Sequence, residues 1–172
     1  MYEARKICNF LLARYDAEAY NLTNLRLNKL LYFIHGWALT NRPNGLVRNH
    51  FEAWKLGPVI KPVFDTFKVF GEKRIQGLAE HLDYASGQTK PISYEDIARA
   101  DADTIASVFE SYTRYTTSEL VALTHEAGGP WDVVYTAWSN DNRLSPRIPN
   151  DLIRDHFLRE AGGQKIFGKA IH

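Results

Sequence analysis

The chain has 172 residues, of which 45% are hydrophobic, 13% aromatic and 24% charged, so its composition is that of a globular domain and excludes a disordered chain. The net charge of +1 argues against a nucleic-acid-binding protein, and the single cysteine, Cys8, excludes a disulfide scaffold, a cysteine-ligated zinc site and a CxxC pair. Neither a secretory signal nor a long apolar run occurs, so we expect a cytoplasmic protein without a membrane span.

The first predicted element is a short amphipathic helix over residues 2–15. After a polar break, residues 25–40 carry the strongest helical pattern of the chain, with Thr23 as a candidate N-cap. Its apolar stripe consists of Leu27, Leu30, Leu31, Ile34 and Ala38. Because Tyr32 and Trp37 extend the apolar surface beyond this stripe, we expect this helix to be the central and most buried one.

The middle of the chain predicts one strand and one helix. Residues 50–56 alternate in polarity and form the best candidate for a strand, which we expect Gly57 and Pro58 to end. Both Pro58 and Pro62 suit the start of the helix that follows. Residues 72–92 predict a loop with at most one short hairpin.

Four more helices are predicted in the second half. They open at Asp101, at Thr117, at Pro130 and at Asn150 or Asp151. The glycine pairs at 128–129 and 162–163 separate or end them, and residues 164–172 read as a loose tail. The sequence therefore predicts a mainly α fold, a single compact domain over residues 1–163 with about seven helices and at most a short two-stranded β ribbon.

The sequence contains no recognisable catalytic, cofactor-binding or metal-binding motif. His125 and Glu126 resemble the start of an HExxH zinc motif, but the second histidine is missing. No Gly-x-Ser-x-Gly elbow and no phosphate-binding loop occur. The charge is uneven, since residues 21–80 sum to +5 and residues 81–143 to −6. This asymmetry suggests a surface that could meet a charged partner.

Three segments taken in order resemble one family. They contain L-x-K-L-L-Y within residues 22–39, A-W-x-x-G-P-V within residues 51–59 and T-H followed by P-W within residues 123–131. Their order and spacing resemble the Panacea domain of SocA-like antitoxins and phage-associated GepA-like proteins, over about residues 5–160. One departure is Leu56, where the family often has an aromatic residue before the Gly-Pro pair.

The resemblance implies a helical, non-enzymatic antitoxin that needs no cofactor and neutralises a cognate protein toxin by direct contact. A cellular protease or chaperone is a further class of partner that such a role admits. On the residues alone, other classes stay open: a nucleic-acid-binding or adaptor protein of phage origin, or a small helical enzyme with an unrecognised site.

Two sets of residues follow as candidates. We expect Arg26, Lys29 and Tyr32 to form an exposed edge of the central helix that binds the toxin, unless this edge is merely solvated or Lys29 pairs with Glu52. The second set is interpreted as structural, with Trp131 anchoring its helix pair onto the central helix. This set comprises Gly57, Pro58, His125, Pro130 and Trp131.

Overall fold

The computed structural model describes residues 1–138 and 146–163, which form seven α-helices, one short 3-10 helix and two small antiparallel sheets. The α-helices are α1 (Ala4–Arg14), α2 (Asn24–Asn41), α3 (Lys61–Phe67), α4 (Arg99–Tyr112), α5 (Thr117–Thr124), α6 (Pro130–Trp138) and α7 (Asn150–Gly163). The fold is therefore mainly α, as predicted, although the five strands make it more than a purely helical protein. The predicted tail at residues 164–172 lies outside the described residues.

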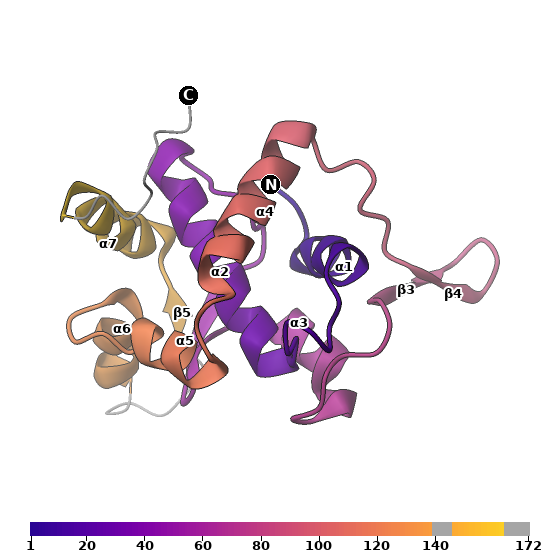
Figure 1. Ribbon diagram of the computed structural model, residues 1–172, viewed down its shortest axis with the longest axis horizontal. Helices are drawn as coiled ribbons and strands as arrows, with labels where there is room; N and C mark the ends of the chain where they lie inside the picture. The colour runs from indigo at the N-terminus through magenta and orange to yellow at the C-terminus, as the bar shows by residue number, and fades with distance from the viewer. Residues whose placement is uncertain (139–145, 164–172) are drawn as a thin grey trace.

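Helix α2 lies at the centre of the molecule, and the other helices are arranged around it (Figure 1). Thr23 caps it as expected, since its hydroxyl oxygen accepts a hydrogen bond from the Arg26 amide at 3.2 Å. The predicted stripe is confirmed, because every member is buried. An 18-residue helix covered on most sides provides a rigid core to which the remaining elements attach.

Helix α7 crosses α2 at a glycine. A Cβ atom on Gly36 would lie 2.2 Å from Cε2 of Phe157, so only glycine lets this ring rest directly against the α2 backbone. The Phe157 ring also packs edge-on against Tyr32, Phe33 and Trp37. The α2–α7 contact is thus an aromatic cluster seated on one residue without a side chain.

The larger sheet has the strand order β2-β1-β5, with β1 (Phe51–Trp54) between β2 (Gly57–Val59) and β5 (Arg147–Ile148). Pro58 was expected to stop a strand and to start a helix, and the structure corrects this, because it pairs with Ala53 inside β2. Proline is tolerated there because β2 is an edge strand. Pro62 does lie in the first turn of α3, as predicted.

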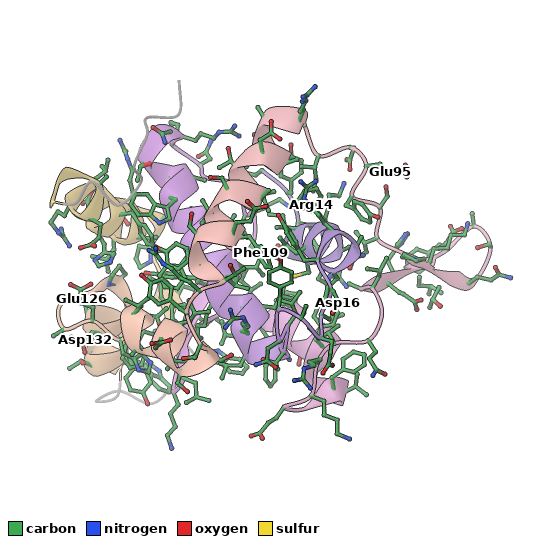
Figure 2. The ribbon with its side chains drawn as sticks, viewed as in Figure 1. Arg14, Asp16, Glu95, Phe109, Glu126 and Asp132 are labelled. Atoms are coloured by element: carbon green, nitrogen blue, oxygen red, sulfur yellow. The ribbon has the colours of Figure 1, made fainter. Side chains whose placement is uncertain are left out.

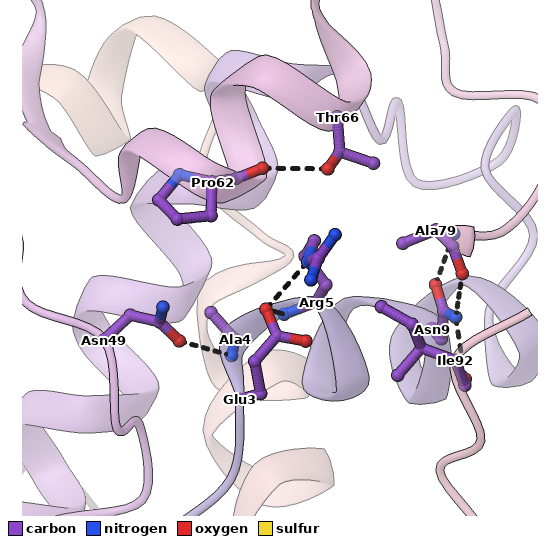
Figure 3. Close-up of polar contacts among 9 residues, drawn as sticks. All are labelled: Glu3, Ala4, Arg5, Asn9, Asn49, Pro62, Thr66, Ala79 and Ile92. Atoms are coloured by element: carbon purple, nitrogen blue, oxygen red, sulfur yellow. Dashed lines mark hydrogen bonds and ion pairs between the residues drawn. The ribbon is translucent and has the colours of Figure 1, made fainter. Parts of the chain in front are cut away.

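The second sheet is the hairpin of β3 (Glu80–Asp83) and β4 (Gln88–Pro91), which extends away from the helices (Figure 1). Its base is held by Asn9, which is fully buried on α1. The Asn9 amide donates to the carbonyl oxygens of Ala79 at 2.8 Å and Ile92 at 2.9 Å, and accepts from the Ala79 amide at 2.7 Å (Figure 3). One side chain therefore fixes both ends of the hairpin segment.

Helix α4 packs against α2, with Phe109 directed into the interior (Figure 2). Its ring stacks on that of Tyr15, the residue that follows α1, with centroids 4.1 Å apart. The N-cap of α5 is one residue earlier than predicted, since Thr116 rather than Thr117 caps the helix and forms a capping box with Glu119. No helix among the described residues is long and apolar enough to cross a membrane.

Candidate functional site

The three motif segments meet at one buried side chain, Lys29 of α2. It is 0% exposed, and its Nζ atom donates a hydrogen bond of 2.8 Å to the carbonyl oxygen of Pro58. Thr124, at the end of α5, lies beside Gly57, because a Cβ atom built on this glycine would be 2.5 Å from Oγ1 of Thr124. We call Lys29, Gly57, Pro58, Thr124 and His125 the lysine junction, because the central helix, the small sheet and α5 join there.

Gly57 is required at the lysine junction for two reasons. Its φ of +95° lies in the region that favours glycine. A Cβ atom would also lie 2.5 Å from Oγ1 of Thr124 and 3.0 Å from Nζ of Lys29. The Gly-Pro pair is therefore a site of close packing, but it belongs to β2 and not to the helix start that was expected of it.

The expected exposed edge of α2 does not exist. Arg26, Lys29 and Tyr32 are 4%, 0% and 2% exposed, so they lack the exposure that was expected of toxin contacts. Arg26 donates to the carbonyl oxygens of Tyr115 at 2.7 Å and Thr113 at 3.1 Å and so closes the end of α4. The physical reason for the error is that backbone carbonyls from far along the chain accept hydrogen bonds from Nη1 and Nη2 of Arg26 and from Nζ of Lys29 in the interior.

The alternative ion pair between Lys29 and Glu52 is also absent. The Glu52 carboxylate accepts a hydrogen bond of 2.8 Å from Trp54 Nε1 and lies 3.5 Å from His50 Nε2. Tyr32 packs edge-on against Phe33 and Phe51 in the core. A role of the three predicted residues in partner binding thus stays a prediction without support from exposure.

Trp131 extends the lysine junction toward β1. Its Nε1 donates to the carbonyl oxygen of Trp54 at 2.8 Å, and its ring stacks on His125 with centroids 3.7 Å apart. Trp131 was expected to anchor its helix pair onto the central helix, whereas this hydrogen bond ties it to β1. Pro130 is buried at the start of α6, in the structural role predicted for it. Nε2 of His125 is buried and has no hydrogen-bond partner among the described residues.

Burial dominates the electrostatics of the lysine junction. It lowers the pKa of Lys29 to about 7. The pKa of His125 is also lowered, first by burial and then by the charge of Lys29. An amine with a pKa near 7 is chemically suited to nucleophilic or base catalysis, but this one is enclosed and cannot meet a substrate in the structure. The junction therefore acts as a structural joint.

We expect Lys29 to make the stability depend on pH. Between pH 7 and 9 the unfolded state keeps the Lys29 proton, because its ordinary pKa is 10.5, whereas the folded state loses it. The free energy of unfolding should therefore rise with pH in this window, by about 1.4 kcal/mol per pH unit at most. Urea unfolding of the wild type and of Lys29→Met at pH 7, 8 and 9 measures this.

The comparison with Lys29→Met is needed because Cys8 acts in the opposite direction. Burial raises the pKa of its thiol, so the unfolded state loses this proton first and the free energy of unfolding falls at alkaline pH. The Cys8 contribution is the same in both proteins and cancels in their difference. If the difference in unfolding free energy between the wild type and Lys29→Met stays constant from pH 7 to 9, Lys29 is not neutral in the folded protein.

Two of the concave regions formed by the described residues are considered as possible binding sites, and both lie outside the lysine junction. A cavity of about 220 Å³ between α4, α5 and α7 is lined by aromatic rings together with Glu126, His156 and Glu160. Nε2 of His156 lies 3.7 Å from the Glu126 carboxylate. Among residues 1–138 and 146–163, no group of three His, Cys, Asp or Glu side chains could hold a metal ion.

The second region is a groove of about 420 Å³ between the start of α2, the β1–β2 turn and α3, which we call the α2–α3 groove. It is lined by Asn24, Leu25, Asn28, Trp54, Lys55, Leu56, Val59, Phe64, Lys68 and Gly71. None of these was a predicted binding residue. A signal was present in Leu56, because it occupies a two-residue turn between strands, where Gly, Asn or Asp are usual.

The comparisons with known proteins agree with the motifs. The family described as "Antitoxin SocA-like, Panacea domain" matches residues 27–132, a range that includes Lys29, the Gly-Pro pair and Trp131. The curated protein Antitoxin SocA of Caulobacter vibrioides (strain NA1000 / CB15N) is 37% identical over 158 residues, which cover 90% of this chain and 82% of that protein. No solved structure matches. The residues that meet at the lysine junction thus lie within the matched range, and the chain belongs to the SocA-like antitoxins with a Panacea domain.

Proposed function

We propose that this protein neutralises a cognate toxin in the cytoplasm by binding it directly, without a chemical step of its own. The observation that carries the proposal is the 37% identity to an antitoxin across 90% of the chain. The geometry supports it, because Lys29, whose pKa of about 7 would suit catalysis, is enclosed and hydrogen-bonded to a backbone carbonyl. Surface complementarity to a protein is then the means of action.

Co-expression with the reading frame adjacent to this gene tests the proposal. If that frame encodes the toxin, its induction alone should stop growth, and co-expression of this protein should restore growth. Affinity purification of a tagged copy should recover the two proteins as a stoichiometric complex. An unfolded variant at the same expression level serves as the control for non-specific rescue.

Two results would contradict direct neutralisation. Growth rescue without any complex in the purified material would indicate an indirect route. Rescue that disappears in a host lacking its main cytoplasmic proteases, while the complex still forms, would show that binding alone does not neutralise. Persistence of both rescue and complex in that host is the expected result.

A further inference from the structure

The α2–α3 groove is an apolar concavity whose charged lining residues are both lysines. Trp54 and Phe64 form its floor, with ring centroids 4.8 Å apart. Leu56 stands at its edge with 53% of its surface exposed, and Val69 on the neighbouring 3-10 helix is 80% exposed. Apolar side chains exposed next to one concave surface are typical of a protein-binding site.

The walls of this groove are held by a row of polar side chains on α2. The Asn24 amide donates to the carbonyl oxygen of Phe64 at 3.0 Å, and the Asn28 side-chain oxygen accepts from the Ile60 amide at 2.9 Å. Asn28 in turn donates to the Asn24 side chain at 3.0 Å. With the Lys29 bond to Pro58, these contacts fix β2 and α3 against the buried helix. The groove is therefore preformed.

The positive charge around the groove favours an acidic partner. Lys55 is exposed and forms no ion pair with any residue that the structure describes. Lys68 pairs with Asp65, which also pairs with Lys61, so this carboxylate is shared between two lysines. The groove has no carboxylate in its lining. The cavity at α4, α5 and α7 differs in this respect, because Glu126 and Glu160 line it.

We infer that the α2–α3 groove is the docking site for an acidic segment of the toxin that inserts an apolar side chain between Leu56 and Phe64. This inference rests on the proposed function and names the surface and the chemistry of the partner. The apolar floor supplies the anchor site, and Lys55 and Lys68 attract the acidic residues on either side of the anchor. A second copy of the chain is less suited to this place, because two such grooves carry the same charge.

Two groove variants test the inference, each with a matched control elsewhere. Leu56→Ser removes the apolar edge, and its control is Leu82→Ser on the distant β3–β4 hairpin, where the leucine is 48% exposed. Lys55→Glu with Lys68→Glu reverses the charge, and its control is Lys90→Glu with Arg99→Glu, which are also exposed. All four proteins should keep the wild-type melting temperature within a few degrees, since the changed residues are on the surface.

The measured quantity is the Kd for the purified product of the adjacent reading frame, in an inactivated form. We expect both groove variants to bind about tenfold or more weakly, and both controls to bind as the wild type. The charge-reversed protein should also lose most of the salt dependence of the association rate. Groove variants that bind and protect cells as well as the wild type would overturn the inference, while failure of the wild type to protect would overturn the proposed function instead.

Crosslinking identifies the occupant. With p-benzoylphenylalanine in place of Leu56, irradiation of the complex should link this position to a toxin peptide that contains Asp or Glu beside an apolar residue. The same substitution at Leu82 should give no such link. A link from position 56 to a second copy of this chain, or to a basic toxin peptide, would overturn the inference.

Discussion

The double variant Arg26→Glu, Lys29→Glu should fail to fold. Both side chains are buried and donate hydrogen bonds to backbone carbonyl oxygens, whereas a carboxylate in their place has no proton to donate. Each substitution places an unpaired negative charge opposite acceptor oxygens in the core, and uncompensated buried charges typically cost about 3–5 kcal/mol each. Since a domain of this size has about 5–15 kcal/mol of total stability, two such changes exhaust it.

Circular dichroism and the melting transition measure the result, and we expect no cooperative transition for the double variant. Lys29→Met is the informative comparison, because it removes the buried amine and leaves the volume filled. It should fold, at a cost of about 1–3 kcal/mol for the unpaired Pro58 carbonyl. A double variant that melts at the wild-type temperature would mean that these side chains are not buried. Their exposed edge of α2 would then again be a candidate toxin-binding surface.

Phe157→Ala should lower the free energy of unfolding by about 3–5 kcal/mol, which is the usual cost of removing a buried aromatic side chain. Phe157 is 2% exposed and packs on Gly36 within a cluster of rings. Because the α2 backbone forms the floor of its site, the surrounding residues have little freedom to close the resulting cavity. Urea denaturation monitored by tryptophan fluorescence measures the loss.

The neighbouring Leu158 provides the control, since it is 40% exposed on the same helix. Leu158→Ala should change stability by about 0.5 kcal/mol or less. Gly36→Ala tests the contact from the other side, because its methyl group would overlap the Phe157 ring and push α7 outward. Equal stabilities for the Phe157 and Leu158 variants would show that α7 is not seated on α2 in this manner.

Helix α2 was predictable from the sequence in almost every respect except the burial of its cations. The apolar stripe and the Thr23 cap are local patterns, and both are confirmed. The burial of Arg26 and Lys29 depends on carbonyls at Thr113, Tyr115 and Pro58, which are tens of residues away. Charged residues are rarely buried fully, so a local pattern assigns them to the surface.

The small sheet was only partly predictable for a related reason. Residues 51–54 alternate clearly enough to indicate a strand, whereas β2 contains a proline and β5 has only two residues. Neither β2 nor β5 has the alternating polarity of a strand in its sequence, and each forms a strand because it pairs with β1. The α2–α3 groove borders this sheet, so its shape could not be predicted before the pairing was known.

The β3–β4 hairpin has a consequence for how the molecule opens locally. Its strands pair only with each other, and most of their residues are exposed, so few contacts oppose its separation from the body. We expect amide hydrogens between residues 82 and 89 to exchange with solvent when the hairpin opens locally. Those near Asn9 should exchange only when the core itself opens. The turn at residues 84–87 is accordingly a place where a fluorophore or an affinity peptide can be inserted without disturbing α2 or the α2–α3 groove.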